Sequence, residues 1–203
     1  MKFLSEIQYF PPVIFYKNSY ACTNIIFDKY EPYQKMSFRN RCIIAGANGT
    51  IILSVPLQEG RNQKRVMKDV RIYGASKWQK DHWKSIISCY NKSPWFEFYK
   101  DELRQLYEKQ FEFLFDWDMA CFEWSIQKLN LPVELSSTED SIPELGDDVL
   151  DFRNKVLPKN YKDFARVSYH QVFESKTGFF PNISILDLLF CEGKRAGEVI
   201  LAH

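Results

Sequence analysis

The chain has 203 residues, of which 45% are hydrophobic and 16% aromatic, and its net charge is +1. This length fits one domain over residues 1–203, or at most two small ones, and the aromatic content makes long disorder unlikely, because disordered chains lack aromatic and β-branched residues. No run of about 18 apolar residues could cross a membrane, and Met1–Glu6 lacks the apolar run of a secretory signal. We therefore expect a cytoplasmic protein without membrane insertion.

The N-terminal residues predict a strand, a turn, a helix and a second strand. Residues 3–7 form a short apolar run, and residues 13–21 are helical in pattern after a proline that suits a first turn. Residues 24–28 then form an apolar strand that ends in Asp28. Because open α/β sheets bind ligands at the carboxyl ends of their strands, Asp28 is a candidate for proton or metal chemistry.

The turn at residues 9–12 contains Tyr9 and two prolines, which have no N–H to donate to a strand. Phosphate-binding turns of α/β folds occupy this place, so Tyr9 is a candidate wall of a ligand site. The alternative is a rigid corner, because the turn is not glycine-rich and the chain has no G-x-G-x-x-G motif or P-loop.

Residues 42–45 and 50–55 are apolar and flank Ala47-Asn48-Gly49, which predicts a hairpin, because Asn and Gly both tolerate positive φ. The apolar arms suggest burial on both faces of the hairpin. Residues 58–68 predict an exposed basic loop, and residues 70–73 a further strand.

Three aromatic-rich helices are predicted over residues 76–90, 97–107 and 111–129, the first of them capped by Ser76. Their ring spacing is typical of core packing rather than of a cofactor site, and the surplus of rings would suit a homodimer surface.

Towards the C-terminus, strands are predicted over residues 133–135 and 164–173, and a helix over residues 182–190. Together the elements predict an α/β fold: a Rossmann-like mixed sheet with flanking helices and an aromatic-rich helical segment.

Charge is distributed unevenly along the chain. Residues 34–92 contain 12 Lys and Arg against 3 Asp and Glu, and residues 93–203 contain 12 against 20. A basic region of this kind attracts an anionic small molecule such as a nucleotide or a sugar phosphate. The alternative is that the two regions neutralise each other in the fold. Nucleic acid is disfavoured as a partner, because the chain as a whole is not basic.

Segment 33–42 concentrates the basic and aromatic residues. Arg39 and Arg41 offer planar forks for phosphate, Asn40 an amide, and Tyr33 a ring that can stack on a base or sugar. This segment is the expected anion site, and a solvated connector is the alternative.

His82, beside Asp81 on a predicted helix, is a candidate general acid or base, although most histidines in such places serve packing. His170 in a predicted strand and the terminal His203 are weaker candidates. With only three histidines and no C-x-x-C among five cysteines, we expect neither a metal site nor a disulfide framework, and Cys191 should be the most exposed cysteine.

Neither pair of neighbouring aspartates stands out as a catalytic dyad. Asp116 and Asp118 lie two apart on a predicted helix and point to different faces, and Asp147 and Asp148 are adjacent in an acidic loop.

Several short motifs together resemble the WbqC-like family, in the short form seen in Bacteroidetes-type bacteria. They are residues 7–12 (IQYFPP), 38–41 (FRNR), 53–56 (LSVP), 78–83 (WQKDHW), 90–96 (YNKSPWF) and 182–190 (NISILDLLF).

The resemblance implies a role beside cell-surface polysaccharide genes, and it marks six motif positions. Its first strand, turn and helix are similar to nucleotidylyltransferase-type Rossmann folds, which is an analogy of fold. Longer members carry a Ser-Gly-rich segment where residues 136–163 are short and acidic here. The motif positions are Arg39, Asn40, Arg41, His82, Asn182 and Asp187.

These observations predict a nucleotide- or sugar-nucleotide-binding, transferase-like enzyme of cell-surface polysaccharide biosynthesis. Arg39 and Arg41 would bind phosphate, Asn40 would orient it, and Asp28 or His82 would do proton or metal work. The alternative is a non-catalytic binding or scaffold protein in a glycan-assembly complex, because no standard catalytic motif is present. The remaining expected ligand contacts are Tyr9, Tyr33, Asn182 and Asp187.

Overall fold

A four-stranded parallel sheet organises the fold. The computed structural model describes residues 1–60, 62, 64–139, 146 and 148–202. The strand order is β5-β2-β1-β6, and Phe3 in β1 lies opposite Ile25 in β2 and Leu150 in β6. The strands are β1 (Lys2–Ser5), β2 (Asn24–Phe27), β5 (Glu134–Ser137) and β6 (Val149–Asp151).

The sheet order reverses at β1. The chain adds β2 and then β5 on one side of β1, and it adds β6 on the other side. The carboxyl ends of β1 and β6 therefore border a topological switch point, which is where open parallel sheets bind ligands.

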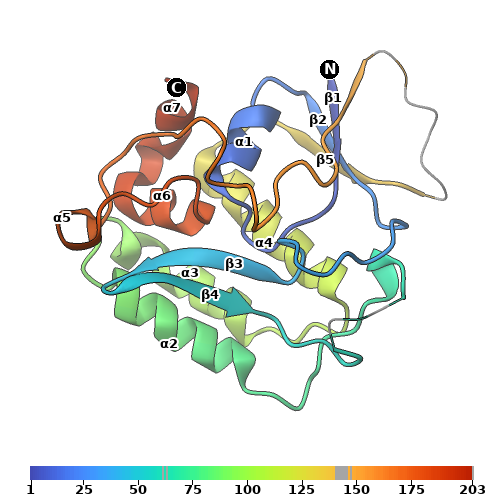
Figure 1. Cartoon of the computed structure of the whole chain (residues 1–203), viewed down its shortest axis with the longest axis horizontal. Coiled ribbons are helices and arrows are strands. Elements are labelled where there is room, and N and C mark those ends of the chain that lie inside the picture. Colours follow the sequence, from blue (N-terminus) through green and yellow to red (C-terminus); the bar gives the residue numbers. More distant parts are fainter. Residues whose placement is uncertain (61, 63, 140–145, 147, 203) are drawn as a thin grey trace.

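Helices α1 (Val13–Ser19) and α4 (Leu114–Leu129) cover one face of the sheet (Figure 1). Phe15 of α1 lies 5.4 Å from Phe3 and 5.6 Å from Phe122 of α4, measured between ring centroids. These buried rings join the sheet and both helices in one hydrophobic core.

A separate antiparallel hairpin consists of β3 (Arg41–Gly46) and β4 (Gly49–Ser54), as predicted. Ala47 and Asn48 form its loop, and of the Asn48-Gly49 pair only Gly49 adopts positive φ, at 131°. The expected burial on both faces holds for β3 and is wrong for β4. Residues 42–45 of β3 are all buried, whereas Ile51 and Ile52 of β4 are 37% and 55% exposed on opposite faces of the hairpin.

The three aromatic-rich helices are confirmed as α2 (Trp78–Tyr90), α3 (Phe96–Glu108) and α4. Trp117 of α4 is fully buried, and its ring lies 5.1 Å from that of Trp78 and 5.2 Å from that of Tyr107. Ser76 does not cap α2, since the helix begins one residue later than a cap at that position would allow.

The strand predicted over residues 164–173 is wrong. Burial alternates there at Val167, Tyr169 and Gln171, but no described strand pairs with the segment. Instead, the side chain of Gln171 bonds the backbone N–H and C=O of Phe180. Residues 70–73 likewise make only isolated bridges instead of the predicted strand.

The remaining helices are short and include the predicted C-terminal one. These short helices are η1 (Met67–Asp69), α5 (Glu174–Thr177), α6 (Ile185–Glu192), η2 (Gly193–Arg195) and α7 (Ala196–Leu201). The core packs against α6, whose first six residues are all buried.

Gly193, directly after α6, is required by both conformation and space. Its φ is 56°, and a Cβ there would lie 2.0 Å from the ring of Trp95. We expect Gly193→Ala to lower the free energy of unfolding by about 3 kcal/mol, since overpacking adds to left-handed strain.

Urea unfolding checks this prediction, with Gly178→Ala as the matched control. Gly178 also has positive φ (75°) but nothing within 4 Å of its added Cβ, so only the conformational strain of about 1 kcal/mol should appear. Equal losses in the two variants would contradict the steric explanation.

Candidate functional site

Asp28 fixes the loop that follows β2. Its Oδ1 accepts hydrogen bonds from the backbone N–H groups of Tyr30 and Glu31, both at 3.1 Å. Its Oδ2 accepts from Nη1 of Arg153 at 2.9 Å. Since Arg153 follows β6, the buried Asp28 side chain ties the carboxyl ends of β2 and β6 together.

Arg39 links three loops at the same edge of the sheet. The side chain is fully buried, and its Nε and Nη2 donate to Oε1 of Glu31 at 2.9 and 2.6 Å. Its Nη2 also donates to Oδ1 of Asn154 at 2.9 Å, and the Asn154 N–H donates to Glu6 at 2.7 Å. Glu6 follows β1, Glu31 follows β2 and Asn154 follows β6, so the network lies at the switch point of the sheet.

Four side chains beside this network keep unused hydrogen-bonding capacity. Buried atoms without a hydrogen bond to any described residue are Nη1 of Arg39, Nε of Arg41, the Tyr33 hydroxyl and both carboxyl oxygens of Asp118. Tyr33 interacts electrostatically with the other three. We call these four residues the buried polar cluster. Buried polar atoms in native proteins nearly always have a partner, so this cluster is the best candidate for contact with a bound molecule.

Burial changes the protonation of the acids at this edge. It raises the pKa of Glu31 to about 7, although the Arg39 guanidinium opposes that shift. Burial also holds the pKa of the Asp118 carboxyl well above its usual range, again against the effect of Arg39. Glu31 is therefore poised to exchange a proton near neutral pH.

Asn40 lies between the two arginines, and its Nδ2 donates to the carbonyl of Val55 at 3.0 Å. Its side chain thus fastens the start of β3 to the residue after β4, while its buried Oδ1 makes no hydrogen bond to a described residue. Segment 33–42 accordingly contributes three side chains to the buried polar cluster, and a fourth, Asn40, holds the segment to the hairpin.

Tyr9 and His82 belong to a different buried network. The Tyr9 hydroxyl contacts the Tyr107 hydroxyl and lies 3.0 Å from Nδ1 of His82, whose Nε2 lies 3.2 Å from the carbonyl oxygen of Ser54. A carbonyl only accepts, so Nε2 donates to Ser54, Nδ1 accepts from Tyr9, and Tyr9 accepts from Tyr107. Burial lowers the pKa of His82 to about 4, which keeps the ring neutral at pH 7.

Asp187 and Asn182 hold the C-terminal helices in place. Asp187 is fully buried and accepts hydrogen bonds from the hydroxyls of Tyr90 and Tyr169, both at 2.7 Å, and from Gln171 at 2.9 Å. Asn182 donates to the carbonyls of Tyr161 and Phe164. Neither residue makes a hydrogen bond or ion pair with the buried polar cluster.

Five residues of this edge were not predicted from the sequence. Asp118 had a usable signal, because it lies four residues after the buried Leu114 and three before the buried Cys121 on α4. Glu31 follows a strand end by only a few residues. The other three residues, Glu6, Arg153 and Asn154, had no local signal in the sequence.

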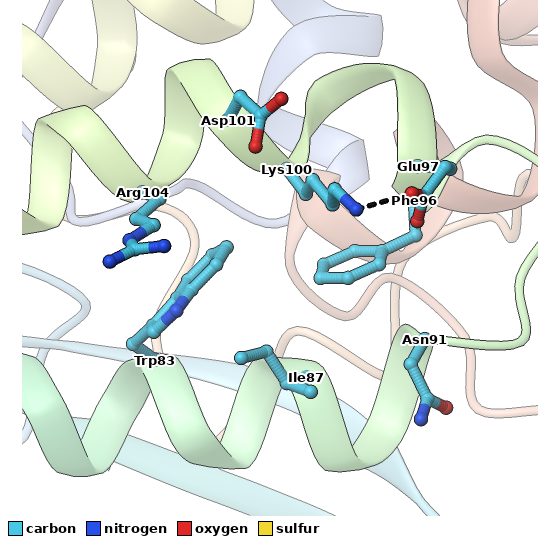
Figure 2. A pocket seen from close by; sticks show the side chains of 8 residues that line it. All are labelled: Trp83, Ile87, Asn91, Phe96, Glu97, Lys100, Asp101 and Arg104. Atoms are coloured by element: carbon cyan, nitrogen blue, oxygen red, sulfur yellow. Dashed lines mark hydrogen bonds and ion pairs between the residues drawn. The ribbon is translucent and has the colours of Figure 1, made fainter.

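A surface groove of about 360 Å³ lies elsewhere, between α2 and α3. Figure 2 shows Trp83 and Ile87 of α2 facing Phe96 and Arg104 of α3 across it. None of the site residues predicted from the sequence lines this groove.

Within the described residues, no group of His, Cys, Asp and Glu could hold a metal ion. No helix in the described part of the chain is long and apolar enough to cross a membrane. Four cysteines are buried, and Cys191 is half-buried, as expected. His170 is exposed outside any strand and lies 3.4 Å from Glu174, whereas His203 falls outside the described residues.

Residues 7–156 match the family described as the WbqC-like protein family. The chain belongs to this family. The resemblance expected from the motifs is thereby confirmed, and the match of this WbqC-like chain includes segment 33–42 and His82 but ends before Asn182. No curated protein and no solved structure matches the chain.

The His82 network predicts a single tautomer. We expect the imidazole to remain neutral at pH 5.5, with its proton on Nε2, whereas a histidine with an ordinary pKa of about 6.5 would be mostly charged. Long-range ¹H–¹⁵N correlation spectra from pH 7 to pH 5 check this, with the exposed His170 as internal reference. Protonation of Nδ1 within this range would contradict it.

Glu31 should make stability depend on pH. The folded state raises its pKa from 4.5 to about 7, so the folded protein holds this proton more tightly than the unfolded chain does. The resulting contribution is complete below about pH 4.5 and is lost as the pH rises through 7. We expect wild type to lose about 2 kcal/mol relative to Glu31→Gln between pH 5 and pH 8.

Urea unfolding at pH 5, 6, 7 and 8 measures this difference. The pH slope is the informative quantity, because a difference between the two proteins that is the same at every pH reports other effects of the substitution. The control is Glu97→Gln on the exposed side of α3, which should run parallel to wild type. Parallel curves for Glu31→Gln and wild type would refute the raised pKa.

Proposed function

We propose that this protein binds a nucleotide or sugar nucleotide at the carboxyl edge of the four-stranded sheet, as a transferase-like enzyme of cell-surface polysaccharide biosynthesis. The observation that carries the proposal is the buried polar cluster, whose two arginine nitrogens, hydroxyl and carboxyl have no hydrogen bond to a described residue. The resemblance to the WbqC-like family supplies the polysaccharide setting.

Arg41 is the cation that we assign to the phosphate. It is half-buried and makes no ion pair with a described residue, whereas Arg39 is committed to Glu31. Arg41 can therefore bind an anion without first breaking an internal pair, and Arg39 adds its free Nη1 from deeper in the cluster. The Tyr33 hydroxyl and Asp118 would then recognise neighbouring polar groups of the ligand.

Glu31 is the group that we assign to proton transfer. Its pKa of about 7 matches the operating pH of a general acid or base, and Arg39 orients its carboxyl group. Asp28 would position the Glu31 loop, since it accepts the backbone N–H of Glu31. Tyr9, His82, Asn182 and Asp187 would support the scaffold around the site rather than touch the ligand.

Calorimetry with a panel of nucleotides and sugar nucleotides tests the proposal. We expect Arg41→Ala to weaken binding at least about tenfold, the loss of one charge-assisted hydrogen bond. The matched control is Arg166→Ala, which removes the same side chain from an exposed loop and should leave the affinity unchanged.

No binding across the panel would overturn the proposal, and so would equal affinities for wild type and Arg41→Ala. Circular dichroism of each variant at the assay temperature establishes that a lost affinity is not lost folding.

A non-catalytic scaffold is the second candidate function. It is favoured by the bonding of two expected site carboxylates, because both oxygens of Asp28 and of Asp187 accept hydrogen bonds from protein groups. A stable complex with a glycan-assembly protein, together with no small-molecule affinity, would support it. Turnover of a substrate by the purified protein would exclude it.

A further inference from the structure

The outer edge of β4 can be identified from the hydrogen bonds of the hairpin. Val55 N donates to the carbonyl of Asn40 at 2.8 Å, so these opposed residues form a hydrogen-bonded pair. Such pairs alternate along an antiparallel ladder, which assigns the next ones to Leu53, Ile51 and Gly49 of β4. The backbone groups of Thr50, Ile52 and Ser54 therefore point away from β3.

Contacts on both sides of the hairpin agree with this assignment. On β3, the outward carbonyl of Ile43 accepts from Ser184 N, and the outward N–H of Ala45 donates to the Tyr90 hydroxyl. On β4, the outward carbonyl of Ser54 accepts from His82. Thr50 and Ile52 make no outward hydrogen bond with any described residue, so four backbone groups form a free edge.

This edge lacks the usual protection against strand pairing. β4 contains no charged residue, and Ile51 and Ile52 are 37% and 55% exposed. By contrast, the outer strands of the parallel sheet carry Glu134 in β5 and Asp151 in β6. Natural proteins place charges, prolines or bulges on exposed edges, so an unprotected apolar edge indicates a pairing surface.

We propose that β4 pairs with β4 of a second copy of this chain, antiparallel and around a two-fold axis at Ile51. The two hairpins then form one continuous four-stranded antiparallel sheet. Thr50 lies opposite the partner's Ile52, and Ile52 lies opposite the partner's Thr50. Figure 1 shows the hairpin lying apart from the labelled strands of the parallel sheet, which leaves both sheets intact in the dimer.

Self-complementarity is the reason for choosing a second copy as the occupant. This register satisfies all four free backbone groups of each copy, and it brings Ile51 beside the partner's Ile51 on the same face of the sheet. Ser54 lies just outside the paired stretch, so its hydrogen bond from His82 is retained. A two-fold axis makes both partners equivalent, so no second surface is needed.

Sedimentation equilibrium of the whole protein tests the dimer. We expect wild type to show the mass of a dimer that dissociates on dilution, and Ile52→Lys to be monomeric, because a charge at the centre of the edge opposes pairing. The matched control is Leu150→Lys, at an aliphatic residue that is 40% exposed on the outer strand β6, and it should remain dimeric.

Cysteine cross-linking tests the register in a Cys191→Ser background. Ile51→Cys should form an intermolecular disulfide under mild oxidation, because the two Cα atoms would lie about 4.5 Å apart. Ile52→Cys should not, although Ile52 is the more exposed residue, because its copies would be separated by more than about 7 Å.

Three results would overturn the proposal: a monomer at all concentrations, a dimer that survives Ile52→Lys, or preferential cross-linking at position 52. Thr50→Pro, which removes an outward N–H and leaves the β3 ladder unchanged, is a second dissociating variant that does not depend on a lysine being tolerated.

Discussion

The buried ion pair between Arg39 and Glu31 is the interaction on which the rest of this edge depends. A charged side chain with no exposure is costly unless it is paired and hydrogen-bonded. Arg39 meets that requirement only when Glu31 and Asn154 are both in place, which in turn requires the loops after β2 and β6 to adopt their observed positions. The pair thereby couples the order of the parallel sheet to the shape of its carboxyl edge.

The sequence predicted the strands and turns that form this edge of the sheet better than it predicted which side chains meet there. Hydrophobic runs and a proline corner were sufficient for β1, α1 and β2, because these elements follow from local patterns. Asp28 and Arg39 were identified from their places relative to strands. By contrast, Arg39 meets Asn154 across 115 residues, and Tyr90 meets Asp187 across 97. Single-sequence patterns contain no information about pairings of that kind, so the partners of Arg39 and the bonding of Asp187 had to come from the structure.

Residues 164–173 show a related limit. Burial alternates at Val167, Tyr169 and Gln171 as it would in the predicted strand, but a strand also needs a neighbour with which to form a ladder. Here the amide of Gln171 takes that place by bonding both backbone groups of Phe180. A sequence pattern with a period of two indicates which side chains are buried. It does not identify the groups that form hydrogen bonds with the backbone.

The hydrogen bond from Asn154 to Glu6 joins residues 148 positions apart in the chain. The ribosome therefore synthesises Glu6 long before Asn154. Contacts of such long range form slowly, because the intervening chain must first be ordered. The arginine and its carboxylate partner are synthesised early, yet they remain without their third loop until β6 has joined the sheet. Affinity for the proposed ligand would thus report completed folding, since a partly assembled sheet would hold Arg39 and Glu31 without the third loop that fixes their positions.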